Sequence, residues 1–285
     1  MTRSIALLSA LLVGCGSSRG PEDYSDWFGP MGDRYEDVME PVEFTDQPYA
    51  YPEQGPGIAG LSGLFEDFNR FYASTDPPPA GCSDWQTTSD LPQEMWVMAT
   101  IHPRYYFKTD GCSTQADAGD SDEKYYGSFF IEDGSGGMFV LGDSKVAHFD
   151  IGDRLKIRIR GVQRNFGLDM VVAHDIIEID RGPYPVYYRD APELVGNAYP
   201  DEWIGSVVRV EGEVVSDPDT FGEFAVLGDN GSTYLIGLDV ELNRRKVRFP
   251  VGSRIRATGP VQRAFGDKII IMRIGQVERL DNIDE

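Results

Sequence analysis

One stretch of this 285-residue chain occurs twice, and the repeat restricts the possible folds more than any other feature. The two copies span Phe129–Gly167 and Ala225–Gly266. Each copy begins with an apolar run and an acidic Gly turn, and each ends with a basic strand followed by V-Q-R-x-F-G. The basic strands alternate charged with apolar residues, which is typical of strands that bury one face. The repeat therefore predicts two small β domains in tandem.

The strand and turn signals place the first β domain at 91–180 and the second at 201–281, with a linker at 181–200. Each domain contains five short runs of strand-forming residues separated by turns, a spacing that indicates a small barrel. Residues 61–90 precede them as a short helix and linker, because apolar side chains recur there at steps of three and four. We expect an all-β fold of two tandem five-stranded barrels.

The first residues have the form of a bacterial export signal. Arg3 precedes a mostly apolar core at Ile5–Val13, which is too short to cross a bilayer. The sequence L-V-G-C that ends at Cys15 resembles the lipobox of bacterial lipoproteins. This resemblance implies that residues 1–14 are removed and that Cys15 carries the lipid of a membrane anchor. Gly16 is similar to the residue found in lipoproteins sent to the outer membrane, facing the periplasm or the exterior. An ordinary signal peptide is the alternative.

Acidic charge is concentrated between this signal and the repeats. The formal net charge of the chain is −21, and residues 21–90 alone contribute −13. Residues 15–60 are rich in Gly, Pro, Ser and acids and have no helical or alternating period, so we expect a disordered acidic tether. The negative field repels polyanions at long range, although a local basic stripe can override it at short range.

The order of strands and turns resembles the OB-fold. The segments that carry the resemblance are W-I-G-S-V-V-R-V-E-G at 203–212, F-I-E-D at 130–133 and G-G-M at 136–138. They are most similar to helix-poor OB-like modules of secreted bacterial proteins. The first copy differs, because it lacks the V-R-V-x-G opening and has an enlarged first loop. The resemblance implies a ligand face across strands two and three, flanked by the 1–2 and 4–5 loops.

Aromatic residues and arginines are the candidate ligand contacts on these faces. The aromatic candidates are Tyr125, Tyr126, Phe130 and Phe139 in the first copy, and Phe221, Phe224 and Tyr234 in the second. They suit stacking on bases or sugars, but strand alternation turns about half of them into a core. Arg164 and Arg263 lie in the 4–5 hairpins, and four arginines precede them on the strands: Arg158, Arg160, Arg254 and Arg256. This set is either an anion-binding stripe or an ordinary solvated strand face.

Two cysteines remain once Cys15 is assigned to the lipid. In an exported chain, Cys82 and Cys112 are expected to form a disulfide that ties the start of the first barrel to its enlarged loop, with two free thiols as the alternative. That loop also holds an acidic cluster at 117–123. The cluster is either a calcium site or a flexible acidic loop, because its oxygen ligands suit Ca²⁺ but their spacing does not match an EF-hand.

Enzymatic chemistry has little support in this sequence. The three histidines form no zinc-binding pattern, and G-x-S-x-G, phosphate-binding loop and Cys–His signals are missing. We therefore expect no enzyme activity, no cofactor and no resident metal. The leading hypothesis is a non-catalytic, envelope-anchored lipoprotein whose barrels bind a protein or a glycan. The alternative is a nucleic-acid-binding OB-fold lipoprotein that acts on extracellular DNA.

Overall fold

The computed structural model describes the two repeat regions and one segment that precedes them. The described ranges are 40–49, 93–101, 105–107, 124–126, 129–140, 149–165, 168–239, 242–243, 245–263 and 266–281, with backbone only at 93, 105–107, 124–126, 160–165, 168 and 172–173. Cys15, Cys82, Cys112, the predicted helix at 61–90 and the acidic loop at 117–123 lie outside them. Of the helices in the described part, none is long and apolar enough to cross a membrane.

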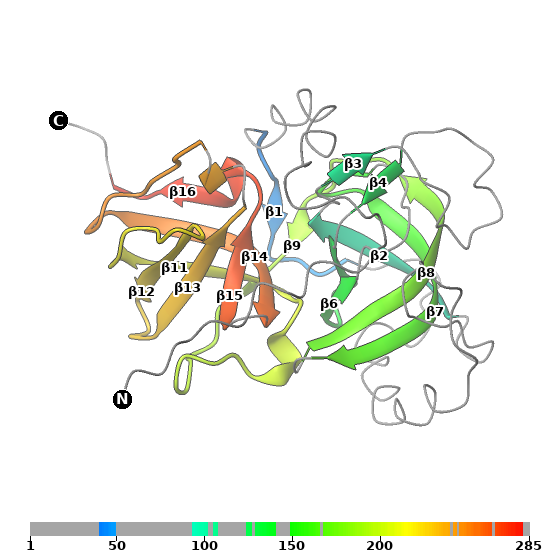
Figure 1. Cartoon of the computed structure of the whole chain (residues 1–285), viewed down its shortest axis with the longest axis horizontal. Helices are drawn as coiled ribbons and strands as arrows, with labels where there is room; N and C mark the ends of the chain where they lie inside the picture. The colour runs from blue at the N-terminus through cyan, green and yellow to red at the C-terminus, as the bar shows by residue number, and fades with distance from the viewer. Residues whose placement is uncertain are drawn as a thin grey trace, which may run out of the picture.

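The first repeat folds into a closed five-stranded barrel, whose strands run from teal (β2) to yellow-green (β8) in Figure 1. Its strands are β2 (Gln93–Ile101), β5 (Phe129–Glu132), β6 (Gly137–Val140), β7 (Arg154–Asn165) and β8 (Leu168–Asp180). They pair in the order β2-β5-β6-β8-β7, and β7 pairs back to β2. The pairing of β6 with β8 is parallel and the others are antiparallel. A short hairpin of β3 (Tyr105–Phe107) and β4 (Lys124–Tyr126) belongs to the enlarged 1–2 loop.

The second repeat has the same topology. Its strands are β11 (Val207–Val214), β12 (Glu223–Gly228), β13 (Thr233–Leu238), β14 (Arg254–Arg263) and β15 (Asp267–Ile271). Their pairings form a ring, β11-β12-β13-β15-β14, which closes through β11 and β14, and β13–β15 is again the parallel pair. The short strands β10 (Arg189–Asp190) and β16 (Val277–Arg279) extend this sheet. The prediction of two tandem OB-like barrels is confirmed.

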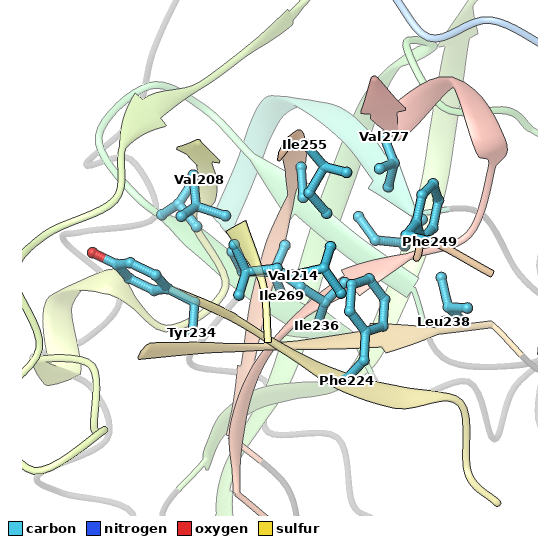
Figure 2. Close-up of a cluster of buried hydrophobic side chains, with 14 of the residues drawn as sticks. Val208, Val214, Phe224, Tyr234, Ile236, Leu238, Phe249, Ile255, Ile269 and Val277 are labelled. Carbon is cyan, nitrogen blue, oxygen red and sulfur yellow. The ribbon is translucent and has the colours of Figure 1, made fainter. Parts of the chain in front are cut away.

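Strand alternation builds a separate core inside each barrel. In β5, Phe129 and Ile131 point into the first core, and they pack with residues of the other four strands. In β12 and β13, Phe224, Tyr234 and Ile236 point into the second core, where Figure 2 shows them among aliphatic side chains and the ring of Phe249. Each barrel therefore has the apolar interior that a small domain needs for stability.

The two barrels pack against each other through a third apolar cluster. The first barrel contributes Met98, Ile101, Phe130, Phe139, Ile151 and Met170, and the second contributes Val207, Ile270 and Met272. At one point the two backbones touch: a Cβ added to Gly137 would lie 2.0 Å from the carbonyl oxygen of Gly205. Gly205 has a φ of +85°, which glycine adopts most readily. No side chain fits between the barrels at this contact.

Residues 40–49 lie between the barrels and contact both of them. Within them, β1 (Phe44–Thr45) pairs in parallel with β9 (Val186–Tyr187), and Figure 1 shows both strands at the junction. Val42 and Phe44 pack on the third apolar cluster, and Glu40 forms an ion pair of 3.3 Å with Arg273. The expected disorder of 15–60 therefore does not extend to these ten residues. Their alternating apolar side chains find a partner surface that the sequence does not reveal.

Candidate ligand-binding surface

The face on which an OB barrel usually binds its ligand is covered in the first barrel. Phe130 and Phe139 point outward from β5 and β6, and their rings meet edge to face at a centroid distance of 5.2 Å. They are only 3% and 8% exposed, because the second barrel and the segment 40–49 pack on this face. The prediction that these two rings contact a ligand does not hold. Their partner is the rest of the chain.

A carboxyl group is buried on the same covered face. Glu132 is 2% exposed, and one of its oxygens accepts a hydrogen bond of 3.1 Å from the backbone N–H of Val207 in the second barrel. Its other oxygen lies 3.9 Å from the guanidinium of Arg189. Burial raises the pKa of Glu132 to about 8, against the smaller opposing effects of Val207 and Arg189. Glu132 thus links the two barrels through a hydrogen bond, and it places an ionisable group between them.

The corresponding face of the second barrel is partly exposed. Ala225 on β12 stands opposite Leu235 on β13, and both point away from the core. Val215, which donates its backbone N–H to the carbonyl of Ala225, extends this row and is 41% exposed. Leu227 lies beside the row and is 42% exposed. These four aliphatic residues form a shallow strip, which we call the open face.

One aromatic side chain stands at the end of the open face. Phe221, in the 1–2 loop of the second barrel, is 77% exposed. The loop is fixed by Asp219, whose carboxylate accepts hydrogen bonds of 2.8 and 2.9 Å from the backbone N–H groups of Phe221 and Glu223. The prediction that Phe221 contacts a ligand is compatible with this exposure. Phe224 and Tyr234 are each 1% exposed, so for these two the core interpretation is correct.

A basic turn lies directly beside the Phe221 loop. The amide nitrogen of Asn243 donates a hydrogen bond of 3.2 Å to the carbonyl of Thr220, and its oxygen accepts one of 3.3 Å from Arg248. Lys246 and Arg248 are exposed, and in the described part of the chain neither forms an ion pair with a carboxylate. Sequence reasoning missed this turn, although R-R-K-V-R at 244–248 is a conspicuous basic run in an acidic chain.

Three arginines of the candidate anion stripe form ion pairs with carboxylates. Arg254 forms a two-pronged ion pair with Asp229, and Arg256 bonds to Glu211 and Glu278. On the first barrel, Arg158 pairs with Glu94, and that hydrogen bond lowers the pKa of the carboxyl and raises the pKa of the guanidinium. These three arginines lie on a solvated strand face. For Arg160 and Arg164 the structure describes the backbone alone.

Arg263 holds the linker to the second barrel. It bonds to both carboxylate oxygens of Asp267 at 3.0 and 3.1 Å, to Asp201, and to the carbonyl of Tyr199. The hydrogen bond to Asp267, which is mostly buried, raises the pKa of Arg263. Three protein partners engage this side chain, so we correct its assignment from ligand contact to structural clamp. Tyr125 and Tyr126 lie on β4, whose backbone alone is described.

Comparison with known proteins found solved structures that are distantly similar to this chain. No protein-family model matches the chain, and no curated protein matches it. Similar solved structures include a tetrameric HIN2 domain (12% identity, 67% of this chain and 93% of that one, TM-score 0.29) and a HINb domain (14%, 68% and 100%, 0.28). A third is a murine DNA-binding protein bound to double-stranded DNA (12%, 66% and 97%, 0.31). At such identities and scores we draw no functional conclusion from them.

The open face, the Phe221 loop and the basic turn together offer one surface to a ligand. In the described ranges, no group of three His, Cys, Asp or Glu side chains is placed to hold a metal ion. The open face supplies flat aliphatic surface, the Phe221 loop supplies an exposed ring, and the basic turn supplies positive charge. These are the components of a surface that binds an extended, anionic and partly apolar ligand.

Proposed function

We propose that the second barrel binds single-stranded nucleic acid across the open face and the Phe221 loop. The observation that carries the proposal is the exposed ring of Phe221 beside two exposed cations, Lys246 and Arg248, at the edge of strands two and three. OB barrels bind single strands on this face by stacking bases on aromatic rings and by attracting the phosphates with nearby cations. A single strand fits because its bases are free to stack.

One acidic residue of the loop, Asp217, is exposed, and two further carboxylates near Phe221 are engaged within the protein. Asp219 is engaged by two backbone N–H groups, and Glu223 is paired with Lys268 of β15. The charge of −13 in residues 21–90 is a long-range effect that salt screens beyond about 8 Å under physiological conditions. Affinity therefore depends on local contacts, and we expect binding to be weak and confined to this surface.

A salt titration with labelled single-stranded DNA tests the proposal. The double variant Lys246→Asn and Arg248→Gln removes two cations, and asparagine tolerates the positive φ of 56° at position 246. Because each lost phosphate contact reduces the slope of log Kd against log salt by about 0.7, the double variant should bind with a slope shallower by about 1.4.

The matched control is Lys156→Gln with Arg158→Gln, which removes the same charge from cations that pair with Glu94. It should bind like the wild-type protein. If both double variants lose the same affinity, binding reflects net charge alone, and the surface is not the site. If the wild-type protein does not bind at low salt, the proposal fails.

A protein partner is the second candidate for the same surface. The observation in its favour is the aliphatic strip of Val215, Ala225, Leu227 and Leu235, because aliphatic side chains pack on a partner better than they stack on bases. A pull-down from envelope extract with wild-type protein and Leu227→Asp separates the two. Loss of a specific protein with retained DNA binding would favour this candidate.

We further propose that the protein is a non-catalytic lipoprotein of the cell envelope, attached through Cys15. The support is the sequence L-V-G-C after a short apolar core. Labelled fatty acid should enter the wild-type chain and not the Cys15→Ser variant. Equal labelling of both would contradict the anchor. In that location, nucleic acid outside the cytoplasm would be the ligand.

A further inference from the structure

The contact between the barrels includes a buried carboxyl group, that of Glu132. Glu132 ends β5 of the first barrel and lies under β11 of the second, where it accepts the N–H of Val207. The groups that face it are Arg189 of β10, at 3.9 Å, and the neighbouring carboxyl of Asp133. Arg189 is itself held near the rings of Tyr187 and Trp203, at 5.8 and 5.6 Å.

Space at this contact is too tight for a charged carboxylate to recruit water without movement. Beside Glu132, the backbones of Gly137 and Gly205 touch, and the N–H of Gly137 donates a hydrogen bond of 3.2 Å to the hydroxyl of Ser206. Val207, which bonds to Glu132, is 1% exposed and belongs to the apolar cluster that joins the barrels. Hydration of an ionised Glu132 therefore requires that β11 move away from β5 and β6.

We propose that Glu132 controls a pH-dependent closure of the junction between the barrels. The neutral carboxyl keeps the two barrels together, and its ionisation separates β11 from the covered face of the first barrel. The movement would expose Phe130 and Phe139, the two rings that the closed form buries. The proposal concerns the junction and does not depend on what the open face binds.

The direction of the pH effect follows from proton binding. The pKa of Glu132 is about 8 in the folded protein, raised by burial from an ordinary value of 4.5. Between these values the unfolded chain has lost its proton and the folded chain retains it. The stabilisation is complete below about pH 4.5, is lost progressively as the pH rises, and is gone above about pH 8.

Urea unfolding of the full-length protein from pH 5 to 9 tests the closure. The unfolding equilibrium constant of the wild type should rise by up to about tenfold per pH unit within the window, relative to Glu132→Gln, which keeps an acceptor for Val207 but carries no titrating group. The control Glu94→Gln, at an exposed carboxyl whose pKa is lowered, should follow the wild type throughout this range. If Glu132→Gln also follows the wild type, the proposal is wrong.

Two further measurements use the wild-type chain, so they do not depend on a variant that folds. The carboxyl carbon of Glu132 should titrate near pH 8 in NMR spectra, and a midpoint near 4.5 would overturn the proposal. Hydrogen exchange at the Val207 amide, corrected for the intrinsic pH dependence of exchange, should accelerate above pH 8 while amides in the core of β13 stay protected. Uniform acceleration would indicate global unfolding and would contradict a closure at the junction.

Discussion

The same face of the same fold is buried in the first barrel and exposed in the second. The outward pair on strands two and three is Phe130 with Phe139 in the first barrel and Ala225 with Leu235 in the second. The two large rings fill the junction, whereas the smaller pair leaves a shallow strip in solvent. The comparison teaches that duplication of a binding module need not duplicate a binding site. One copy can use its ligand face to hold the other.

The largest expected effect comes from the covered face. Phe130→Ala removes a ring that is 3% exposed and leaves a cavity between the barrels, which should lower the free energy of unfolding by about 3–5 kcal/mol. Leu235→Ala, on the open face, should cost less than about 1.5 kcal/mol because the side chain is only partly buried. Urea unfolding of both variants measures the difference. Equal losses would mean that the two faces are not distinct.

The next effect concerns Arg273, which connects three parts of the chain. Its guanidinium is 4% exposed and pairs with Asp150 of the first barrel at 3.1 Å and with Glu40 at 3.3 Å. Arg273→Ala should destabilise the protein by about 2–3 kcal/mol, below the usual loss for a fully buried pair because both carboxylates are partly solvated. Arg279→Ala, at an exposed pair with Asp281, should change stability by less than about 0.5 kcal/mol. If Arg273→Ala lowers the free energy of unfolding as little as Arg279→Ala does, Arg273 does not stabilise the junction.

A smaller effect is expected at Arg263, which sequence reasoning assigned to the ligand. Arg263→Ala should lower the free energy of unfolding by about 1–3 kcal/mol, because the mostly buried carboxylate of Asp267 loses its charged partner. Binding to DNA should be unchanged at temperatures well below the melting transition. If Arg263→Ala weakens DNA binding without changing the free energy of unfolding, Arg263 contacts the ligand after all.

The smallest effect on stability, and the largest on binding, should come from Phe221. The ring is 77% exposed, so Phe221→Ala should change the free energy of unfolding by less than about 0.5 kcal/mol. Loss of one stacked base should weaken DNA binding by about 1–3 kcal/mol, or about 5- to 150-fold. Phe221→Trp is the matched control and should retain binding. Loss of binding in both variants would point to the loop shape rather than stacking.

The repeat and its alternation were enough to predict both barrels, but not which aromatics point outward. When the two copies of the repeat are aligned by their acidic turns, Phe130 corresponds to Val226. The strand pairings instead match it with Ala225, because Glu132 pairs with Gly137 across four residues and Leu227 pairs with Thr233 across five. One extra turn residue moves each side chain to the other face. Turn length, rather than composition, therefore decided which of the candidate residues point outward.

Contacts between distant segments explain the other differences. Nothing near Arg263 in the sequence shows that Asp201, 62 residues earlier, will reach it. Likewise, the order in residues 40–49 depends on β9 and on Arg273, which come much later in the chain. The basic turn was predictable in principle, since R-R-K-V-R stands out by charge alone. Its position beside Phe221 was not, because the hydrogen bond from Asn243 to Thr220 exists only in the fold.

The central claim is that only the second barrel presents its ligand face. Photo-crosslinking of the full-length protein to single-stranded DNA, followed by mass spectrometry of the attached peptides, tests it most directly. Crosslinks should fall within 215–248, at the Phe221 loop, the open face and the basic turn, and should disappear in Phe221→Ala. Crosslinks at Phe130 or Phe139 in the folded protein well below pH 8, where Glu132 is neutral and the junction is closed, would show that the covered face is accessible, and would contradict the account.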